Sequence, residues 1–272
     1  MVTPIRNQLV SKLRFGIRCV CAERNGYKCP EPDYGPMAPT LELNKHYADR
    51  LKTVLRLRHE PVACRLIREN EEFPACCTPV KDPISHCQAV FKAAEGECLA
   101  LTVEQESCHV GACVLGMIDT PSNVATGTAH FNIGAHDSPE AAKEMIDKRL
   151  LVPFKTKGEV ACPLKDADFV PDVVIIADIP ERVYWVVPLE TAAGGGRAEF
   201  STAPFQCCCE DVEAVPIVTG RPNISIGCFG CRKRTTIKAD EMVVGIPYDR
   251  MPAYVEHLDR YESGIMAKAK RD

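Results

Sequence analysis

The pattern of hydrophobic and polar positions predicts a chain in which helices and strands alternate. Apolar residues recur at helical spacing from Tyr47 to Leu55, and Thr40 is placed to cap that helix. In contrast, Pro61–Ile67 and Pro171–Ala177 are nearly continuous apolar runs, as is typical of buried strands. This alternation favours an α/β or α+β fold.

Two later helices carry clear signals at their N-termini. Ser85 can cap a helix over residues 86–94. Ser138-Pro139-Glu140 combines a cap, a first-turn proline and an acid near the positive end of the helix dipole. The other expected elements are strands at 98–104, 223–226 and 242–246, and helices at 139–150, 180–191 with a break near Pro188, 209–215 and 251–261.

Two cysteine pairs with equal spacing indicate an internal duplication. Twenty residues separate Cys87 from Cys108, and twenty separate Cys207 from Cys228. Two half-domains related by a pseudo-twofold axis would each bring two thiolates to a shared interface. The expected organisation is a cysteine-bearing N-terminal extension at 1–40 and two similar half-domains, 41–150 and 151–272, packed as one globular unit.

Composition narrows the possible environments of the protein. The net charge of -4 gives no reason to expect nucleic acid as a partner, and no run approaches the roughly 20 apolar residues of a membrane span. The N-terminus lacks the features of an export signal, so we expect a cytoplasmic protein. Disulfides are rare in a reducing cytosol, so the sixteen cysteines need another explanation.

Metal ligation is the explanation that the cysteine clusters favour. A four-thiolate site suits zinc or an iron–sulfur cluster, because both bind soft sulfur. Only Cys228-x-x-Cys231 has the spacing of a zinc knuckle, so ligands spread over long intervals favour a [4Fe-4S] cluster. The alternative to metal ligation is that these cysteines are buried free thiols. The candidate ligands are Cys87, Cys108, Cys207, Cys208, Cys228 and Cys231, with the fourth ligand left open among Cys207, Cys208, Cys209 and Cys231.

Other residues near these cysteines are candidates for supporting roles. Gly111 and Gly230 would let the backbone approach a cluster and donate N–H groups to it. His109 or His136 would be the proton donor of a catalytic site, and Arg232 its anion anchor. The alternative for each is an ordinary polar contact.

A second cysteine set lies in the N-terminal extension. Cys19, Cys21 and Cys29 could hold a second metal or cluster, completed by Cys76 and Cys77. The remaining cysteines in apolar, strand-like runs are expected to be core residues: Cys64, Cys98 and Cys162.

The Cys228-x-x-Cys231 segment also allows a dithiol redox pair. A thioredoxin-like pair would open a helix, and the residues after Cys228 give no convincing helix signal. This possibility therefore ranks below a metal site.

A series of short motifs resembles a known family. The chain is similar, over about residues 41–262, to the prokaryotic domain of unknown function one hundred and sixty-nine. The motifs are Pro61-Val62-Ala63, His86-Cys87-Gln88-Ala89, Cys108-x-x-Gly111-Ala112, Leu115-Gly116, Ser138–Ala142, Pro171–Val174, Gly220–Asn223, Gly227-Cys228-x-Gly230-x-Arg232 and Asp240–Pro247. The resemblance implies no activity, but it implies that Cys87, Cys108 and Cys228 occupy family cysteine positions, and that related proteins occur in archaea and anaerobic bacteria.

Together these observations predict an iron–sulfur protein of anaerobic metabolism. Its role would be electron transfer or reductive chemistry on a small molecule, as an iron–sulfur oxidoreductase if it is an enzyme. Its partner would be a small-molecule substrate or a redox partner protein, and the composition is compatible with a homo-oligomer. Two alternatives stay open: a zinc-stabilised binding or scaffold module, and a thiol-based redox or persulfide carrier.

Overall fold

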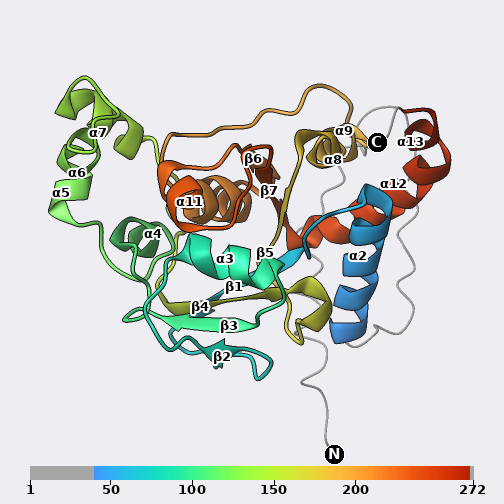
Figure 1. The fold of residues 1–272 in the computed structure, drawn as a ribbon, viewed down its shortest axis with the longest axis horizontal. Helices are drawn as coiled ribbons and strands as arrows, with labels where there is room; N and C mark the ends of the chain where they lie inside the picture. The colour runs from blue at the N-terminus through green and yellow to red at the C-terminus, as the bar shows by residue number, and fades with distance from the viewer. Residues whose placement is uncertain (1–39, 270–272) are drawn as a thin grey trace, which may run out of the picture.

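One mixed seven-stranded sheet organises the protein in the computed structural model, which describes residues 40–269. The strand order is β2-β3-β4-β1-β5-β7-β6, and every neighbouring pair is antiparallel except β2 and β3 (Figure 1). The α/β or α+β prediction is therefore confirmed. The strands are β1 (Val62–Arg68), β2 (Thr78–Pro79), β3 (Leu99–Thr102), β4 (Thr156–Pro163), β5 (Val173–Asp178), β6 (Asn223–Ser225) and β7 (Met242–Pro247).

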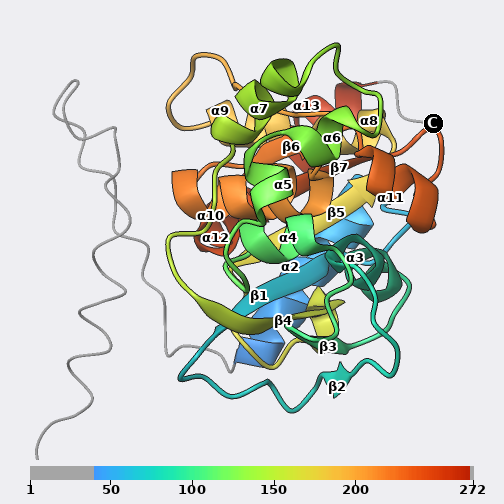
Figure 2. The same cartoon turned by 90° about the vertical axis from the view of Figure 1, so that its left-hand side faces the viewer.

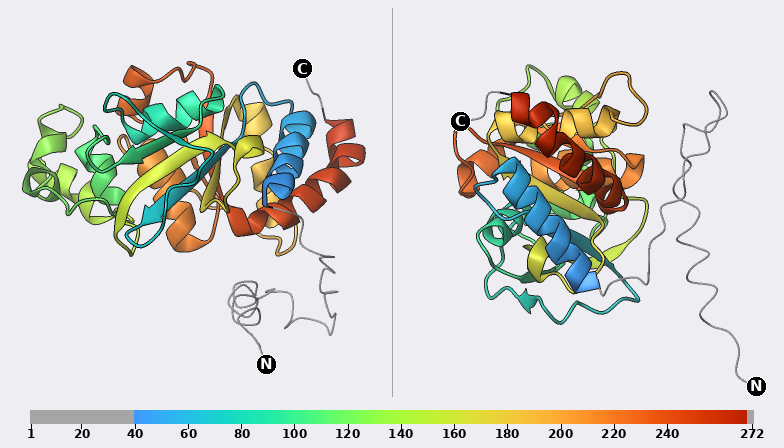
Figure 3. Two further views of the ribbon diagram at one scale, coloured as in Figure 1. Left: turned by 90° about the horizontal axis from the view of Figure 1, so that it is seen from below. Right: turned by 90° about the vertical axis from the view of Figure 1, so that its right-hand side faces the viewer.

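Helices cover both faces of this sheet (Figures 2 and 3). Neighbouring residues of β5 point to opposite sides: Val174 packs in the core beneath α2 and α12, and Val173 packs in the core beneath α3 and η3. The α-helices are α2 (Thr40–Leu55), α3 (His86–Ala94), α4 (His109–Val114), α5 (Ser122–Ala125), α6 (Thr128–Phe131), α7 (Pro139–Asp147), α8 (Pro180–Val183), α9 (Val186–Thr191), α10 (Val215–Thr219), α11 (Phe229–Arg234), α12 (Met251–Ser263) and α13 (Ile265–Lys268). The other helical segments are η2 (Leu164–Asp166) and η4 (Tyr248–Arg250), which are 3-10 turns, and η3 (Cys207–Ala214), a π-helix. No helix within 40–269 is long and apolar enough to cross a membrane.

Local sequence signals explain most of these elements. The Ser85 side chain accepts a hydrogen bond from the Gln88 N–H, and the Gln88 side chain accepts one from the Ser85 N–H, so α3 begins with a capping box. The predicted helices over 139–150 and 180–191 are also present, with shifted bounds. The predicted helix over 180–191 is broken at Tyr184 and Trp185, and not near Pro188. Pro188 falls in the first turn of α9, where a missing N–H costs little.

One strand was missed and one local prediction was wrong. Strand β4 was not predicted as an element, although the run around Cys162 is strand-like, because buried Thr156 and Glu159 interrupt its apolar pattern. The expected absence of a helix after Cys228 was wrong, since α11 begins at Phe229. Its cap is the Cys228 thiol, whose sulfur accepts the N–H of Cys231 at 3.4 Å, and cysteine is not among the residues that ordinarily signal a helix start.

The sheet has the same order of elements on either side of its centre. Strands β1 and β5 pair antiparallel there, with Ala63 opposite Val174. Outward from them, β4 corresponds to β7 and β3 to β6. Both β4 and β7 end in a proline, Pro163 and Pro247, with the same backbone angles (φ -53°, ψ 133°) before a 3-10 turn. This is the arrangement that a duplication would produce; the duplication and its half-domain boundaries stay predictions, and residues 1–39 lie outside the described chain.

The π-helix η3 lies directly against β7 at Gly245. A Cβ atom at this position would overlap the carbonyl oxygen of Val212 and contact the carbonyl carbon behind it. The backbones can approach only because residue 245 has no side chain. This contact fixes the height of η3, and therefore of Cys207 and Cys208, above the sheet.

Gly245→Ala is therefore expected to lower the free energy of unfolding by about 1–3 kcal/mol or more, since backbone must move to admit the methyl group. Urea unfolding of both proteins would measure the difference. Gly194→Ala is the control, because a Cβ there meets no atom within 4 Å and should change stability by less than about 0.5 kcal/mol. Equal effects of the two substitutions would contradict the close approach of η3 and β7.

Candidate metal centre

Five cysteine side chains meet between α3, η3 and α11, on the face of the sheet opposite α2. We call this set the five-cysteine group: Cys87, Cys207, Cys208, Cys228 and Cys231. Each sits at the start of a helical segment. Cys87 lies in the first turn of α3, Cys207 and Cys208 open η3, and Cys228 caps α11 three residues before Cys231.

Cys231 is the common member of the group. Its Sγ atom lies 3.2 Å from that of Cys87, 3.4 Å from that of Cys228 and 3.5 Å from that of Cys208. The sulfurs of Cys207, Cys208 and Cys231 also lie within 4.8 Å of one another. Cys207, Cys208 and Cys231 are each 0% exposed, so the sulfurs converge in the protein interior.

The backbone at the start of η3 is unusual. Gln206 has φ 69° and ψ 36°, a left-handed conformation that costs free energy for a residue with a large side chain. The following turn is wound as a π-helix, in which the N–H of Asp211 donates to the carbonyl of Gln206 at 3.1 Å. Strained residues and π-helical turns occur often at functional sites. Here they set the positions of two adjacent cysteines.

The loop before α11 is held by Arg232. Its guanidinium donates to the carbonyl oxygens of Ile226, Lys238 and Glu241, all within the segment that surrounds Cys228. Gly227 takes φ +90° in this loop, where a Cβ would lie 3.0 Å from Nε of Arg232. Arg232 therefore positions the Cys228 loop, and its role as an anion anchor stays a prediction.

Cys108 lies outside the five-cysteine group. Its thiol caps α4 and accepts the N–H of Gly111 at 3.4 Å. A Cβ on Gly111 would lie 3.7 Å from both the Cys108 sulfur and the Cys209 Cβ, so Cys108 neighbours Cys209 instead. At Gly230 the corresponding Cβ would lie 3.7 Å from the Cys228 sulfur. Both glycines are thus beside thiols, at ordinary contact distance.

The thiols of the group control one another's protonation. Hydrogen bonds from Cys207, and then from Cys208, Cys228 and Cys87, lower the pKa of Cys231 below its ordinary value. The hydrogen bonds to Cys231, together with burial, raise the pKa values of the other four thiols of the group in return. One thiolate shared among protonated neighbours is the state expected of a soft-metal site before the metal displaces the protons.

A buried histidine bridges two buried carboxylates beside the group. Nδ1 of His86 lies 2.6 Å from Oε2 of Glu159, and Nε2 lies 2.8 Å from Oε2 of Glu213. We call these three residues the Glu–His–Glu triad; all are at most 2% exposed. Burial alone would lower the pKa of His86, but the two carboxylates raise it well above its ordinary value. The imidazole therefore carries a proton at neutral pH.

A third buried acid lies close to the triad. Oε1 of Glu106 accepts the N–H of Cys108 at 2.6 Å. Burial, reinforced by the charge of Glu159, raises the pKa of Glu106 to about 8. Glu106 is therefore mostly protonated at neutral pH, which limits the negative charge around His86.

The two predicted proton donors lie in different surroundings. His109 is exposed at the first position of α4. His136 packs its ring against Phe205, 6.3 Å between centroids, and its Nε2 is buried without a hydrogen-bond partner. Neither histidine belongs to a metal-ligand group among the described residues, and their catalytic roles stay predictions.

Sequence reasoning did not find the triad. His86 stands next to the candidate ligand Cys87, but Glu159 is a single acid with no motif around it, and nothing in the sequence distinguishes Glu213 from the neighbouring acids Glu210 and Asp211. The signal available was Glu159, a glutamate directly before the apolar run Val160–Cys162. An acid in a buried run of this kind must be paired or protonated.

The fold and the five-cysteine group define a cysteine-rich α/β protein with a candidate metal centre. The sequence profile of the family DUF169, described as uncharacterised ArCR, matches residues 50–257, so the chain belongs to that family. An uncharacterised protein of Methanocaldococcus jannaschii is 29% identical over 216 residues, which cover 79% of this chain and 93% of that protein. No solved structure matches the chain. The resemblance inferred from the motifs is confirmed.

Proposed function

We propose that the five-cysteine group holds an iron–sulfur cluster and that the protein works in electron transfer or reductive chemistry in anaerobic metabolism. The observation that carries this proposal is the convergence of five thiols from three separate elements at one buried point. A structural zinc ion takes four ligands, usually from paired short knuckles. An all-thiolate donor set with one knuckle fits a cluster better.

The surrounding chain supplies what a cluster needs. The N–H of Cys231 already points at the sulfur of Cys228, and hydrogen bonds to ligand sulfurs tune a cluster's potential. Burial of Cys207 and Cys208 keeps water from one side of the site. Free thiols in such numbers persist in a reducing compartment, so we place the protein in the cytoplasm.

A redox partner protein could reach the site at α11. Phe229 and Ile226 are exposed large apolar residues on either side of Cys228. The ammonium group of Lys233 lies over the ring of Phe229, 5.6 Å from the centroid of the ring. An apolar surface with basic residues beside a buried centre is suited to brief contact with an electron carrier or small anionic substrate.

A single zinc ion is the second candidate occupant. Tetrahedral zinc with Zn–S bonds of about 2.3 Å places its sulfurs about 3.8 Å apart. The separations of 3.2 to 3.5 Å around Cys231 are close to that value. A zinc-stabilised module would unfold on chelation, and reductants would not change its absorbance.

The start of α11 at Phe229, directly after Cys228, supports the alternative that Cys228 and Cys231 form a dithiol redox pair. Cys228 caps the helix, and Cys231 has a lowered pKa, so the pair has the position of a thiol redox motif. Oxidation would join the two sulfurs and pass two electrons and two protons to a disulfide-bearing partner. A mixed disulfide trapped at either residue would support this function over a cluster.

Anaerobic purification followed by iron, sulfide and zinc analysis tests the proposal. We expect iron and acid-labile sulfide in equal amounts, with a visible absorbance that bleaches on reduction. A colourless protein with zinc and no sulfide would establish the second candidate instead. A metal-free protein with all thiols reduced would exclude both metal functions.

A further inference from the structure

A second set of cysteines lies on the opposite face of the sheet from the five-cysteine group. Strand register brings three of them together. Thr78 of β2 pairs with Leu99 of β3, and Leu99 pairs with Ala161 of β4. Cys77 and Cys98 directly precede Thr78 and Leu99, and Cys162 directly follows Ala161 in the antiparallel strand β4, so the three cysteines occupy neighbouring places.

These three cysteines share one face of the sheet. Side chains alternate between the faces along a strand. Leu99 and Ala161 pack beneath α3, so the adjacent cysteines face the core beneath α2. Directly neighbouring residues on one face have Cβ atoms about 4.5–5.5 Å apart, which lets their thiols converge.

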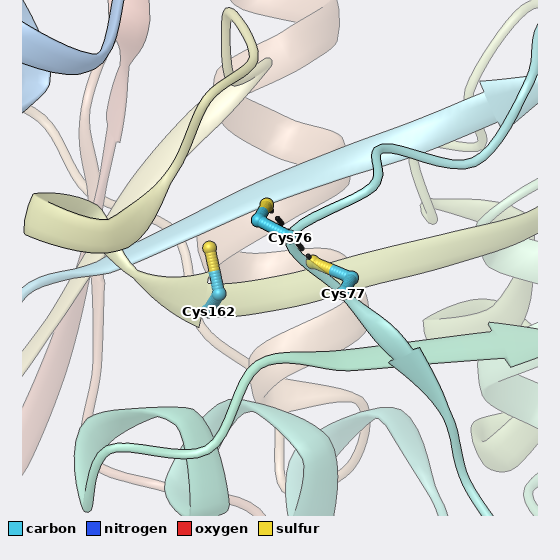
Figure 4. Close-up of side chains that lie close together, drawn as sticks. All are labelled: Cys76, Cys77 and Cys162. Atoms are coloured by element: carbon cyan, nitrogen blue, oxygen red, sulfur yellow. Dashed lines mark hydrogen bonds between the residues drawn. The ribbon is translucent and has the colours of Figure 1, made fainter.

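The sulfurs of Cys77 and Cys162 do converge, and the sulfur of Cys76 joins them. Sγ of Cys76 lies 3.7 Å from Sγ of Cys77, and the sulfurs of Cys76, Cys77 and Cys162 all lie within 4.8 Å of one another (Figure 4). Cys98, which lies beside Cys77 and Cys162 in the strand register, is the candidate for the fourth ligand, although its sulfur is not among the three that lie within 4.8 Å of one another.

The geometry points to a second metal site, in which Cys76, Cys77, Cys98 and Cys162 bind one zinc-like ion. Tetrahedral zinc places its sulfurs about 3.8 Å apart, close to the separation of Cys76 and Cys77. All four ligands come from the protein, so the site is closed and structural. This inference goes beyond the proposed function and does not depend on it.

Ordinary core packing does not account for these four thiols. Cys77 and Cys162 are buried, but Cys76 and Cys98 are partly exposed, so hydrophobic burial does not explain the choice of cysteine there. The same partial exposure lets an ion reach the site from solvent.

A structural ion bound by these cysteines would stabilise the edge of the sheet at β2. Strand β2 has only two residues, both exposed, and it closes one edge of the sheet. The loop before it carries Cys76 and Cys77, whereas Cys162 lies near the end of β4 beside η2. An ion bound by all four cysteines would fasten that loop to the sheet.

Zinc protection of thiols tests this site in the full chain without disturbing its fold. Metal-free, reduced protein would be treated with iodoacetamide with and without added zinc, and the labelled cysteines would be mapped by mass spectrometry. We expect zinc to slow the labelling of Cys76 and Cys98. Cys76 and Cys98 labelled at the same rate with and without zinc would overturn the proposal.

Metal counting on variants gives the second measurement. A Cys77→Ser/Cys162→Ser variant should bind one zinc fewer per chain and lose part of the thiolate-to-cobalt absorbance after cobalt exchange. The matched control is Cys64→Ser, a buried cysteine outside both groups. Circular dichroism would confirm that both variants fold. Unchanged stoichiometry in the folded double variant would overturn the site.

Two further variants separate this site from others. Cys87→Ser/Cys231→Ser removes ligands of the five-cysteine group and should leave zinc protection of Cys76 and Cys98 intact, whether or not that group binds iron. Serine at Cys19, Cys21 and Cys29, which lie outside the described residues, should also leave it intact. Loss of protection in either variant would contradict the ligand set.

Discussion

Cys231→Ser is expected to remove most of the metal bound at the five-cysteine group. Its sulfur is the one that lies near Cys87, Cys228 and Cys208 together, so no other thiol can take its place. Loss of a residue that only supports a ligand already costs about 10–100-fold in metal affinity. Loss of a central ligand should exceed about 100-fold, measured as iron, sulfide or zinc per chain after anaerobic purification.

Cys209→Ser is the matched control for this experiment. Cys209 belongs to the same triple-cysteine run and is 3% exposed, but it lies beside Cys108 and not in the five-cysteine group. We expect this variant to keep its metal. Normal metal content in Cys231→Ser, or equal losses in the two variants, would show that Cys231 is not a central ligand.

The contrast between Cys108 and Cys231 shows what cysteine spacing can and cannot predict. Cys87 and Cys207, the first members of the two equally spaced pairs, both lie in the first turn of a helical segment. Cys108 and Cys228, the second members, both cap a helix. The third residue after each cap is Gly111 in one case and Cys231 in the other. Spacing could not reveal that difference in role, because it depends on how α4 and α11 sit relative to α3.

The fold was predictable where local chemistry determines structure. The capping box at Ser85 and the apolar run in β5 each specify their element with little help from the rest of the chain. Strand β4 was not predictable, because Glu159 breaks its apolar pattern and is stabilised by His86, 73 residues away. The order of strands depends on such long-range contacts, which no short window of sequence contains.

The same contact links the fold to the candidate metal centre. His86 opens α3 immediately before Cys87, Glu213 belongs to η3 with Cys207 and Cys208, and Glu159 anchors both to β4. The Glu–His–Glu triad therefore joins two of the three elements that carry the five-cysteine group. Charge pairing beneath the sulfurs holds α3 and η3 at a fixed separation.

His86→Ala is expected to lower the free energy of unfolding by about 3–5 kcal/mol, because it leaves two buried carboxylates without a counter-charge. Neither Glu159 nor Glu213 forms an ion pair with Lys or Arg in the part of the chain that the structure describes. Urea unfolding of samples matched for metal content would measure the loss. Glu159→Gln/Glu213→Gln in the same background should recover part of it, since two neutral amides need no cation.

The pH dependence of the His86 effect separates charge pairing from simple loss of packing. The two carboxylates raise the pKa of His86 in the folded protein, so folding takes up a proton above the ordinary histidine pKa of about 6.5. The stabilisation is therefore complete below that pH and declines as the pH rises through the raised value. Lys143→Ala, which breaks an exposed pair with Asp147, should cost less than about 1 kcal/mol. If the loss of stability in His86→Ala were as small as that in Lys143→Ala and did not change with pH, the triad would not hold α3 and η3 together through charge.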